Sequence, residues 1–181
     1  MRCTALLSDE HKAILRALNL LRAVAPGATR GNPEAVENAI KLVDFFREFV
    51  DHFHFLKEET LLFPRLRKLM PAGSGSVTKL RLENDQSRAL LHNMGNALGG
   101  NRAHFGLYAE RFGQLLAGHV GKEDKTLFPR AESILSEEDD DELANAFETL
   151  QARMGEDVTR RFYQMLESLE EECVPGLEVA G

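Results

Sequence analysis

Two stretches of the chain are nearly the same: HFLKEETLLFP at residues 54–64 and HVGKEDKTLFP at residues 119–129. Each begins with a histidine, carries a glutamate four residues later and closes on Leu-Phe-Pro. Residues four apart in an α-helix lie one turn apart on the same face, so each stretch sets an imidazole beside a carboxylate. A second copy of so specific a pattern predicts that the fold consists of two similar halves.

Apolar residues recur with helical spacing along the whole chain, and no segment alternates with period two for long. The pattern predicts four long helices, at 8–24, 33–69, 77–98 and 102–134. Ser8 is the expected N-cap of the first helix, and Pro64 and Pro129 are expected to kink or break the second and the fourth. The Gly- and Pro-rich stretches 25–33 and 71–76 are expected to be loops. Helices of similar reach joined by short loops predict an all-α fold, an antiparallel up-down four-helix bundle.

The bundle is predicted to occupy residues 1–135, and an additional C-terminal helical segment residues 136–181. Ser136 and Asp139 resemble a capping box at the start of this segment, and Gly155 is the expected break within it. The segment has no counterpart in the repeat. It is therefore expected to pack on the bundle as an extra layer or to form a dimer contact.

Three histidines and two glutamates fall on the apolar stripes of the predicted helices: His11, His54, Glu58, His119 and Glu123. Unpaired charges in an apolar interior are costly, so two glutamates there need a shared positive charge. Two metal ions, bridged by both carboxylates and held by imidazoles at the bundle centre, would supply it. A lone histidine on such a stripe is more often a hydrogen-bonded core residue, and a His-Glu pair is common on surfaces. Two matching copies on alternate helices favour the metal site.

The donor types limit the metal. Histidine and carboxylate without thiolate suit iron, manganese or zinc. Structural zinc usually takes four ligands and often includes cysteine, but Cys3 and Cys173 lie near opposite ends of the chain and match no zinc spacing. Five or more nitrogen and oxygen ligands spread over four helices therefore favour two iron ions as the cofactor.

The sequence resembles the hemerythrin-like family, also called HHE cation-binding domains. The matching pieces are DEH at 9–11, HFLKEETLLFP at 54–64, ENDQSR at 83–88 and HVGKEDKTLFP at 119–129. The resemblance covers roughly residues 5–135 and implies an up-down four-helix bundle around a non-haem di-iron centre. It also implies imidazole ligation by the three inward histidines and bridging by Glu58 and Glu123. Asp124 is the alternative second bridge, since some members place that carboxylate five residues after the histidine.

The third predicted helix departs from the family pattern. Residues 83–85 read END where the family usually reads EHD, so Asn84 stands in place of an iron-binding histidine. Asn84 is expected to bind metal through its carbonyl oxygen, through a water, or not at all, and its weaker donor changes the affinity of one position. Arg88 takes the place of a second histidine of oxygen-carrying members. It is expected either to neutralise a bridging carboxylate or to pair with Asp85 at the surface.

Four other residues are not expected to be ligands: His52, which falls on the face away from His54, and His92, His104 and Tyr108. His92 lies two turns from Asn84, which is too far along the helix to replace the missing imidazole. Tyr108 is expected to pack in the core, with a hydrogen-bonding or redox role beside the centre as the alternative.

Charge and composition exclude several classes of partner. A formal net charge of −7, from 22 basic and 29 acidic residues, disfavours nucleic acids and anionic membrane surfaces. No apolar run approaches the length that spans a membrane. Two scattered cysteines suit a reducing compartment, so the cytoplasm is the expected location.

The resemblance implies a protein that binds or senses a small diatomic ligand such as oxygen or nitric oxide, with an enzymatic role undecided. An iron donor or iron–sulfur cluster repair protein is the alternative from another class, although such relatives often carry a cysteine-rich N-terminal segment, and here there is only Cys3. A third possibility is a bundle with a degenerate metal site that docks a partner through residues 136–172. A homodimer is compatible with each of these.

Overall fold

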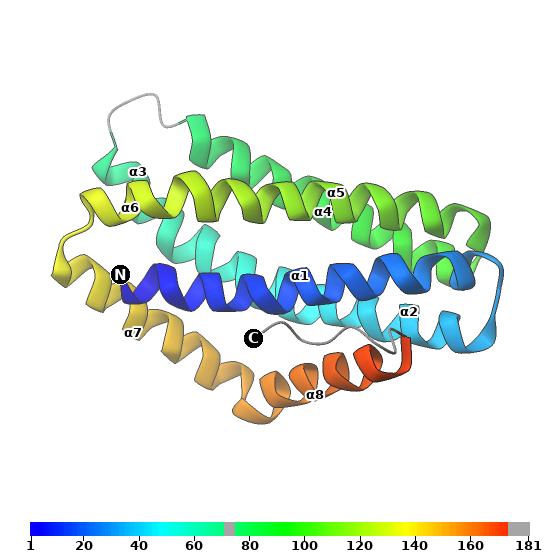
Figure 1. Cartoon of the computed structure of the whole chain (residues 1–181). Helices are drawn as coiled ribbons and strands as arrows, with labels where there is room; N and C mark the ends of the chain where they lie inside the picture. The colour runs from blue at the N-terminus through cyan, green and yellow to red at the C-terminus, as the bar shows by residue number, and fades with distance from the viewer. Residues whose placement is uncertain (71–74, 174–181) are drawn as a thin grey trace.

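The computed structural model describes residues 1–70 and 75–173, and this part of the chain is helical with no strand (Figure 1). The first long helix is α1 (Arg2–Thr29). The second is continuous from residue 33 to residue 69 and contains the segments α2 (Pro33–Phe45), η1 (Phe46–Phe55), η2 (Glu58–Leu62) and α3 (Phe63–Leu69). The third is α4 (Gly75–Gly99). The fourth contains η3 (Arg102–His104), α5 (Phe105–Lys122), η4 (Glu123–Leu127) and α6 (Phe128–Ile134).

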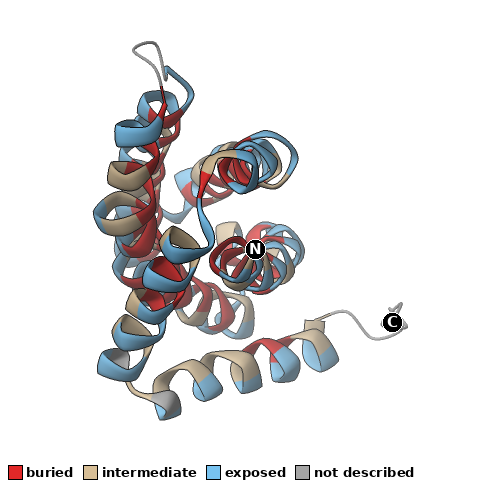
Figure 2. Ribbon diagram, turned by 90° about the vertical axis from the view of Figure 1, so that its left-hand side faces the viewer, coloured by how far each residue is buried: buried red, intermediate tan, exposed pale blue. Residues whose placement is uncertain are grey.

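These four runs form the predicted antiparallel bundle. Helix α1 packs against α2 and α5, and α4 packs against the same two helices, so each run has two neighbours. Figure 2 shows the buried residues on the inward faces and the exposed residues on the outer ones. None of the helices in the described ranges combines the length and the apolar character that crossing a membrane requires.

Helix α1 is longer at both ends than the sequence predicts. It begins at Arg2, so Ser8 lies inside it and the prediction of Ser8 as N-cap is wrong. The backbone N–H groups of Arg2 and Cys3 both donate to the carboxylate of Asp140, each at 2.9 Å, and this distant residue supplies the cap. The C-terminal end continues to Thr29 with Pro26 inside the helix, so the predicted loop at 25–33 shrinks to three residues, Arg30–Asn32.

The late prolines do not break their helices, because each follows a π-helical segment. The backbone N–H of Phe63 donates to the carbonyl of Glu58, five residues back, and Phe128 does the same to Glu123. The wider turn lets Pro64 and Pro129 fall in the first turn of a new α segment, where a missing N–H donor leaves no bond unmade. Helix α4 begins at Gly75, two residues earlier than predicted, and residues 71–74 of the predicted loop lie outside the described residues.

Two further helices follow the bundle, α7 (Glu137–Met154) and α8 (Glu156–Cys173). The Ser136–Asp139 capping box opens α7, and Gly155 ends it with a φ of 92°. Both helices contact α1 on one side of the bundle (Figure 1). The ring of Phe162 packs edge-on against Phe45, with centroids 5.6 Å apart. We call α7 and α8 the extension.

The apolar core consists of two clusters, one toward each end of the bundle. One is rich in phenylalanine and includes Phe46, Phe49 and Phe112. The other includes Leu7 and Leu62. The buried polar residues His11, His54, Glu58, Asn84, His119 and Glu123 belong to neither cluster. A buried polar site thus lies apart from both apolar clusters of the interior.

Candidate metal centre

Each half of the bundle presents one histidine and one glutamate from the same helix. His54 is near the end of η1, and Glu58 is the first residue of the π segment η2. His119 is in the last turn of α5, and Glu123 is the first residue of the π segment η4. All four side chains are fully buried. Segments of π-helix are rare and are frequently found at functional sites.

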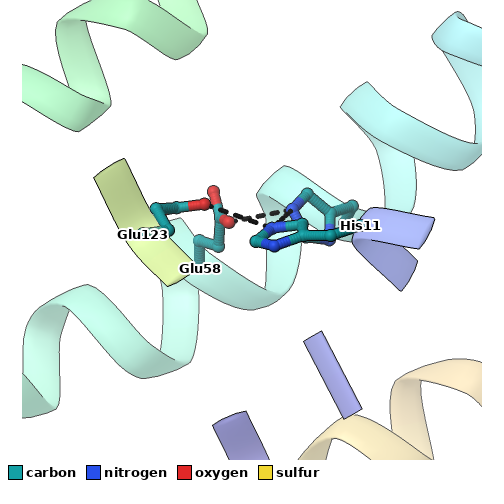
Figure 3. Close-up of side chains that lie close together, drawn as sticks. His11, Glu58 and Glu123 are labelled. Atoms are coloured by element: carbon teal, nitrogen blue, oxygen red, sulfur yellow. Dashed lines mark hydrogen bonds and ion pairs between the residues drawn. The ribbon is translucent and has the colours of Figure 1, made fainter. Parts of the chain in front are cut away.

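The five inward residues of the sequence analysis come together at the bundle centre. His11, Glu58 and Glu123 point toward one another from α1, η2 and η4 (Figure 3). The Nε2 atoms of His11 and His54 are 3.2 Å apart, and His54 Nε2 is 2.9 Å from Glu58 Oε1. His11 Nε2 is 3.3 Å from Glu123 Oε2. Each of these four residues offers a donor atom within 4.8 Å of the other three.

His119 lies at the edge of this group. Its Nε2 is 3.3 Å from Glu123 Oε2 and 3.9 Å from Glu58 Oε2. It does not belong to the cluster of four donors. The two glutamates therefore lie between His119 on one side and the His11–His54 pair on the other.

The outer nitrogens of the imidazoles are held by carboxylates, which the sequence analysis did not assign. His54 Nδ1 is 2.8 Å from Glu10 Oε2, and His119 Nδ1 is 3.2 Å from Glu83 Oε2. Lys57 pairs with the other oxygen of Glu10, and Lys122 pairs with that of Glu83. Such contacts fix the orientation of an imidazole ligand and raise its basicity. The sequence carried a signal for them, since HxxKE occurs in both repeats.

The family resemblance gives Asp124 as the alternative second bridging carboxylate. In the structure its carboxylate contacts the outer nitrogen of His11. Its Oδ1 lies 2.9 Å from His11 Nδ1 and accepts a hydrogen bond from the hydroxyl of Ser8 at 3.0 Å. The ring of His11 also stacks on Phe128, with centroids 5.4 Å apart and an interplanar angle of 8°. His11 is thus held on its ring face and on its outer nitrogen.

Asn84 reaches the centre from α4 and is fully buried. Its amide nitrogen donates to Glu58 Oε2 at 3.2 Å and to Glu59 Oε1 at 3.1 Å. Arg88 in turn donates to Glu59 and to Asp85, both at 2.9 Å. Arg88 is therefore paired with outer carboxylates and not with either glutamate of the centre.

The remaining candidates lie away from the centre. His92 is exposed and contacts Asn96, and His52 is exposed and contacts Glu48. His104 is exposed, and Tyr108 is half-buried with its ring 6.3 Å from that of His104.

Protons and carboxylates balance the buried charges in the metal-free protein. Burial alone would lower the pKa of His54, but Glu58 and Glu10 outweigh it and raise that pKa to about 10. Burial alone would raise the pKa of Glu58, but His54 and His119 hold it well below its usual value. The pKa of His119 is raised well above its ordinary value, because Glu123 and Glu58 outweigh its burial. A metal ion that binds here must displace these imidazole protons.

Residues 4–131 match the family model of the hemerythrin HHE cation-binding domain. The chain belongs to the hemerythrin family. A search among curated proteins found no match. The family match ends before the extension, so the hemerythrin part comprises the four bundle runs that surround the centre.

A hemerythrin metal centre needs oxygen and nitrogen donors that are free to bind, and the donor set at this centre meets that requirement. Among the described residues, several buried atoms at the centre form no well-aligned hydrogen bond: Glu58 Oε1, both carboxylate oxygens of Glu123, His119 Nε2 and Asn84 Oδ1. Some of them still lie close to an imidazole nitrogen, as Glu58 Oε1 does at 2.9 Å from His54 Nε2. Buried polar atoms are normally hydrogen-bonded, so a cluster of unpaired ones indicates a missing ion or water. Carboxylate and imidazole donors suit a divalent transition metal. The residues present therefore fit a metal ion.

Proposed function

We propose that this chain is a hemerythrin-like protein that holds two non-haem iron ions bridged by carboxylates and binds or senses a small ligand such as oxygen or nitric oxide. The observation that carries the proposal is the group of buried carboxylate and imidazole atoms that converge at the bundle centre without well-aligned hydrogen bonds. His11, His54 and His119 would be the nitrogen ligands, and Glu58 and Glu123 the bridging carboxylates. Bound iron would supply a redox-active Lewis acid there.

The protein surroundings of the proposed ligands hold them in place and exclude water. Glu10, Glu83 and Asp124 contact the outer nitrogens of the three imidazoles, so each ring keeps its inner nitrogen toward the centre. The ring of Phe55 packs edge-on against His119 at 5.7 Å between centroids, and Phe128 covers His11. All of the proposed ligands are at most 1% exposed. A centre that is buried this deeply favours an exogenous ligand of only a few atoms.

Asn84 supports ligand binding or sensing over oxygen carriage. An amide in place of an imidazole leaves one metal with fewer protein nitrogen ligands, and that gives an exogenous ligand a place to bind. Arg88, which is held by Glu59 and Asp85, replaces a further imidazole of the oxygen-carrying relatives.

The test is reconstitution of the purified full chain with ferrous iron under anaerobic conditions. We expect about two iron ions per chain, as in other carboxylate-bridged bundle sites, and visible absorption that changes when oxygen or nitric oxide is added. A reconstituted protein that retains no iron would overturn the proposal and favour a degenerate site that serves as an interaction module.

Iron donation is the second candidate function, and the amide of Asn84 is the observation that favours it, because a weaker donor set releases metal more readily. In that case iron should leave the loaded protein for an apo iron–sulfur acceptor faster than it leaves for buffer.

A cytoplasmic location is part of the proposal, and in the part of the chain that the structure describes neither Cys3 nor Cys173 forms a disulfide.

A further inference from the structure

We propose that the two metal positions are unequal and fill in order, the His11–His54 position first and the His119–Asn84 position second. This inference rests on the proposed function, since it concerns the same pair of ions. It adds that the chain with a single metal is a stable state, and that the metal beside Asn84 is the exchangeable one.

The donors are the first reason for inequality. On one side, the Nε2 atoms of two imidazoles converge to 3.2 Å, and Glu58 and Glu123 complete a cluster within 4.8 Å. On the other side, the described residues place a single imidazole, that of His119, 3.3 Å from Glu123 and 3.9 Å from Glu58. Affinity for a divalent transition metal rises with the number of imidazole donors, so the first side binds more tightly.

The orientation of Asn84 is the second reason. Its NH2 group faces two carboxylates, Glu58 and Glu59, at 3.2 and 3.1 Å. Turning the amide over would set its oxygen against carboxylate oxygens, so the observed orientation is the one that satisfies the hydrogen bonds. The NH2 group is no metal ligand. Asn84 therefore offers no nitrogen donor on this side, and its one free atom is the amide oxygen Oδ1, a weaker donor than an imidazole nitrogen.

The extension is the third reason, because it covers only one side of the centre. Lys57, behind His54, is 1% exposed, and its ammonium lies 3.5 Å above the centre of the Phe53 ring and 5.9 Å from that of Phe147 in α7. Lys122, the equivalent residue behind His119, has a side chain that is 55% exposed. The Lys122–Glu83 pair that holds His119 is therefore closer to solvent than the Lys57–Glu10 pair that holds His54.

The experiment is a titration of the metal-free full chain with Co²⁺ under anaerobic conditions, followed by visible absorption and by metal analysis after dialysis against a chelator. We expect two separate steps, with one tightly held ion left after dialysis. Asn84→His should tighten the second step and leave the first unchanged. Asn96→His is the matched control, since it makes the same change at an exposed position of α4 and should alter neither step.

A second pair of variants assigns the steps to the two sides. His119→Ala should leave one tight Co²⁺ per chain, whereas His11→Ala should lose the tight step. Circular dichroism of each metal-free variant establishes that it is folded. Two ions that bind in a single step of equal affinity, or a second step that Asn84→His does not tighten, would overturn this inference and leave the proposed function standing. A chain that binds no Co²⁺ and no iron would overturn both.

Discussion

The two halves of the bundle hold the same outer framework around different inner residues. In the first half Lys57 and His54 share Glu10, and in the second Lys122 and His119 share Glu83. His11 contacts Asp124, the residue after one central glutamate, and Asn84 contacts Glu59, the residue after the other. The framework of outer carboxylates is thus retained even where an amide replaces the imidazole.

The halves differ most in what lies outside them. The extension packs against α1 and against η1 and η2, and no equivalent helix in the described ranges covers α4 and α5 (Figure 1). As a result, a lysine with the same role is buried in one half and exposed in the other. The comparison teaches that a symmetric set of ligand positions can still hold its metals in unequal surroundings.

The largest expected effect comes from removing what the two halves share. Glu58→Ala or Glu123→Ala should abolish dinuclear binding, because each carboxylate is proposed to bridge both ions. Metal analysis of reconstituted protein measures this, and His104→Ala, at an exposed position, should keep the wild-type content. If the histidine variant lost metal as fully as the glutamate variants, the ligand assignment would be wrong.

A large difference is expected between the two lysines. Lys57→Met leaves Glu10 buried without its ammonium partner and should lower the free energy of unfolding by about 3 kcal/mol. Lys122→Met removes a pair with an exposed lysine and should cost about 0–1 kcal/mol. Urea denaturation of the metal-free proteins gives both values. Equal losses in the two variants would contradict the difference in burial described above.

The outer carboxylates should have a smaller effect, expressed in metal affinity. Glu10→Gln and Glu83→Gln should each weaken metal binding by about 10- to 100-fold, because the imidazoles lose the partners that orient them. Competition with a chromophoric chelator measures the change. Glu110→Gln, an exposed residue of α5, is the control and should bind metal as the wild type does. Wild-type affinity in both of the first two variants would mean that the outer contacts do not tune the centre.

The smallest effect concerns the attachment of the extension in acid. Burial would raise the pKa of Asp140, but the thiol of Cys3 and the backbone N–H groups of Cys3 and Arg2 outweigh it and lower that pKa. A carboxylate whose pKa is lowered on folding stabilises the protein above its unfolded value of about 3.9, and this contribution is lost as the pH falls below it.

Thermal melts followed by circular dichroism at pH 6 and pH 3 test this attachment. The melting temperature of Asp140→Asn should therefore fall less than that of the wild type between the two conditions. An equal fall in both proteins would show that Asp140 does not contribute to this acid sensitivity.

The parts of the fold that the sequence predicts well are those set by local pattern. The helical span 33–69 and the capping box at Ser136 follow from periodicity and from contacts within a few residues. The start of α1 does not, because its cap is Asp140, far away along the chain. The continuity of the helix past Pro64 could not be predicted either, because the presence of a proline does not show that a π segment precedes it.

At the metal centre, too, local sequence pattern predicts some features and contacts between distant residues decide the others. The duplicated His-Glu pair identifies four candidates in the sequence: His54, Glu58, His119 and Glu123. The structure places these residues together with His11. The role of Asn84 depends on which way its amide points, and only the positions of Glu58 and Glu59 decide that. The assignment of metal ligands stays a prediction for the whole set: His11, His54, Glu58, Asn84, His119 and Glu123.

The π segments determine where these helices can lose a residue without losing their register. Each accommodates one more residue per turn than an α-helix would before Leu-Phe-Pro resumes the α-helical course. Deleting the exposed Thr60 would let this turn close as an ordinary α-helical turn, with the residues beyond it in nearly the same orientation. Phe63 and Leu66 would keep their core-facing positions, whereas a deletion in an α-helical stretch would rotate everything beyond it by about 100°. Loss of a single residue between Glu58 and Phe63 should thus disturb the core less than the same loss elsewhere in the helix.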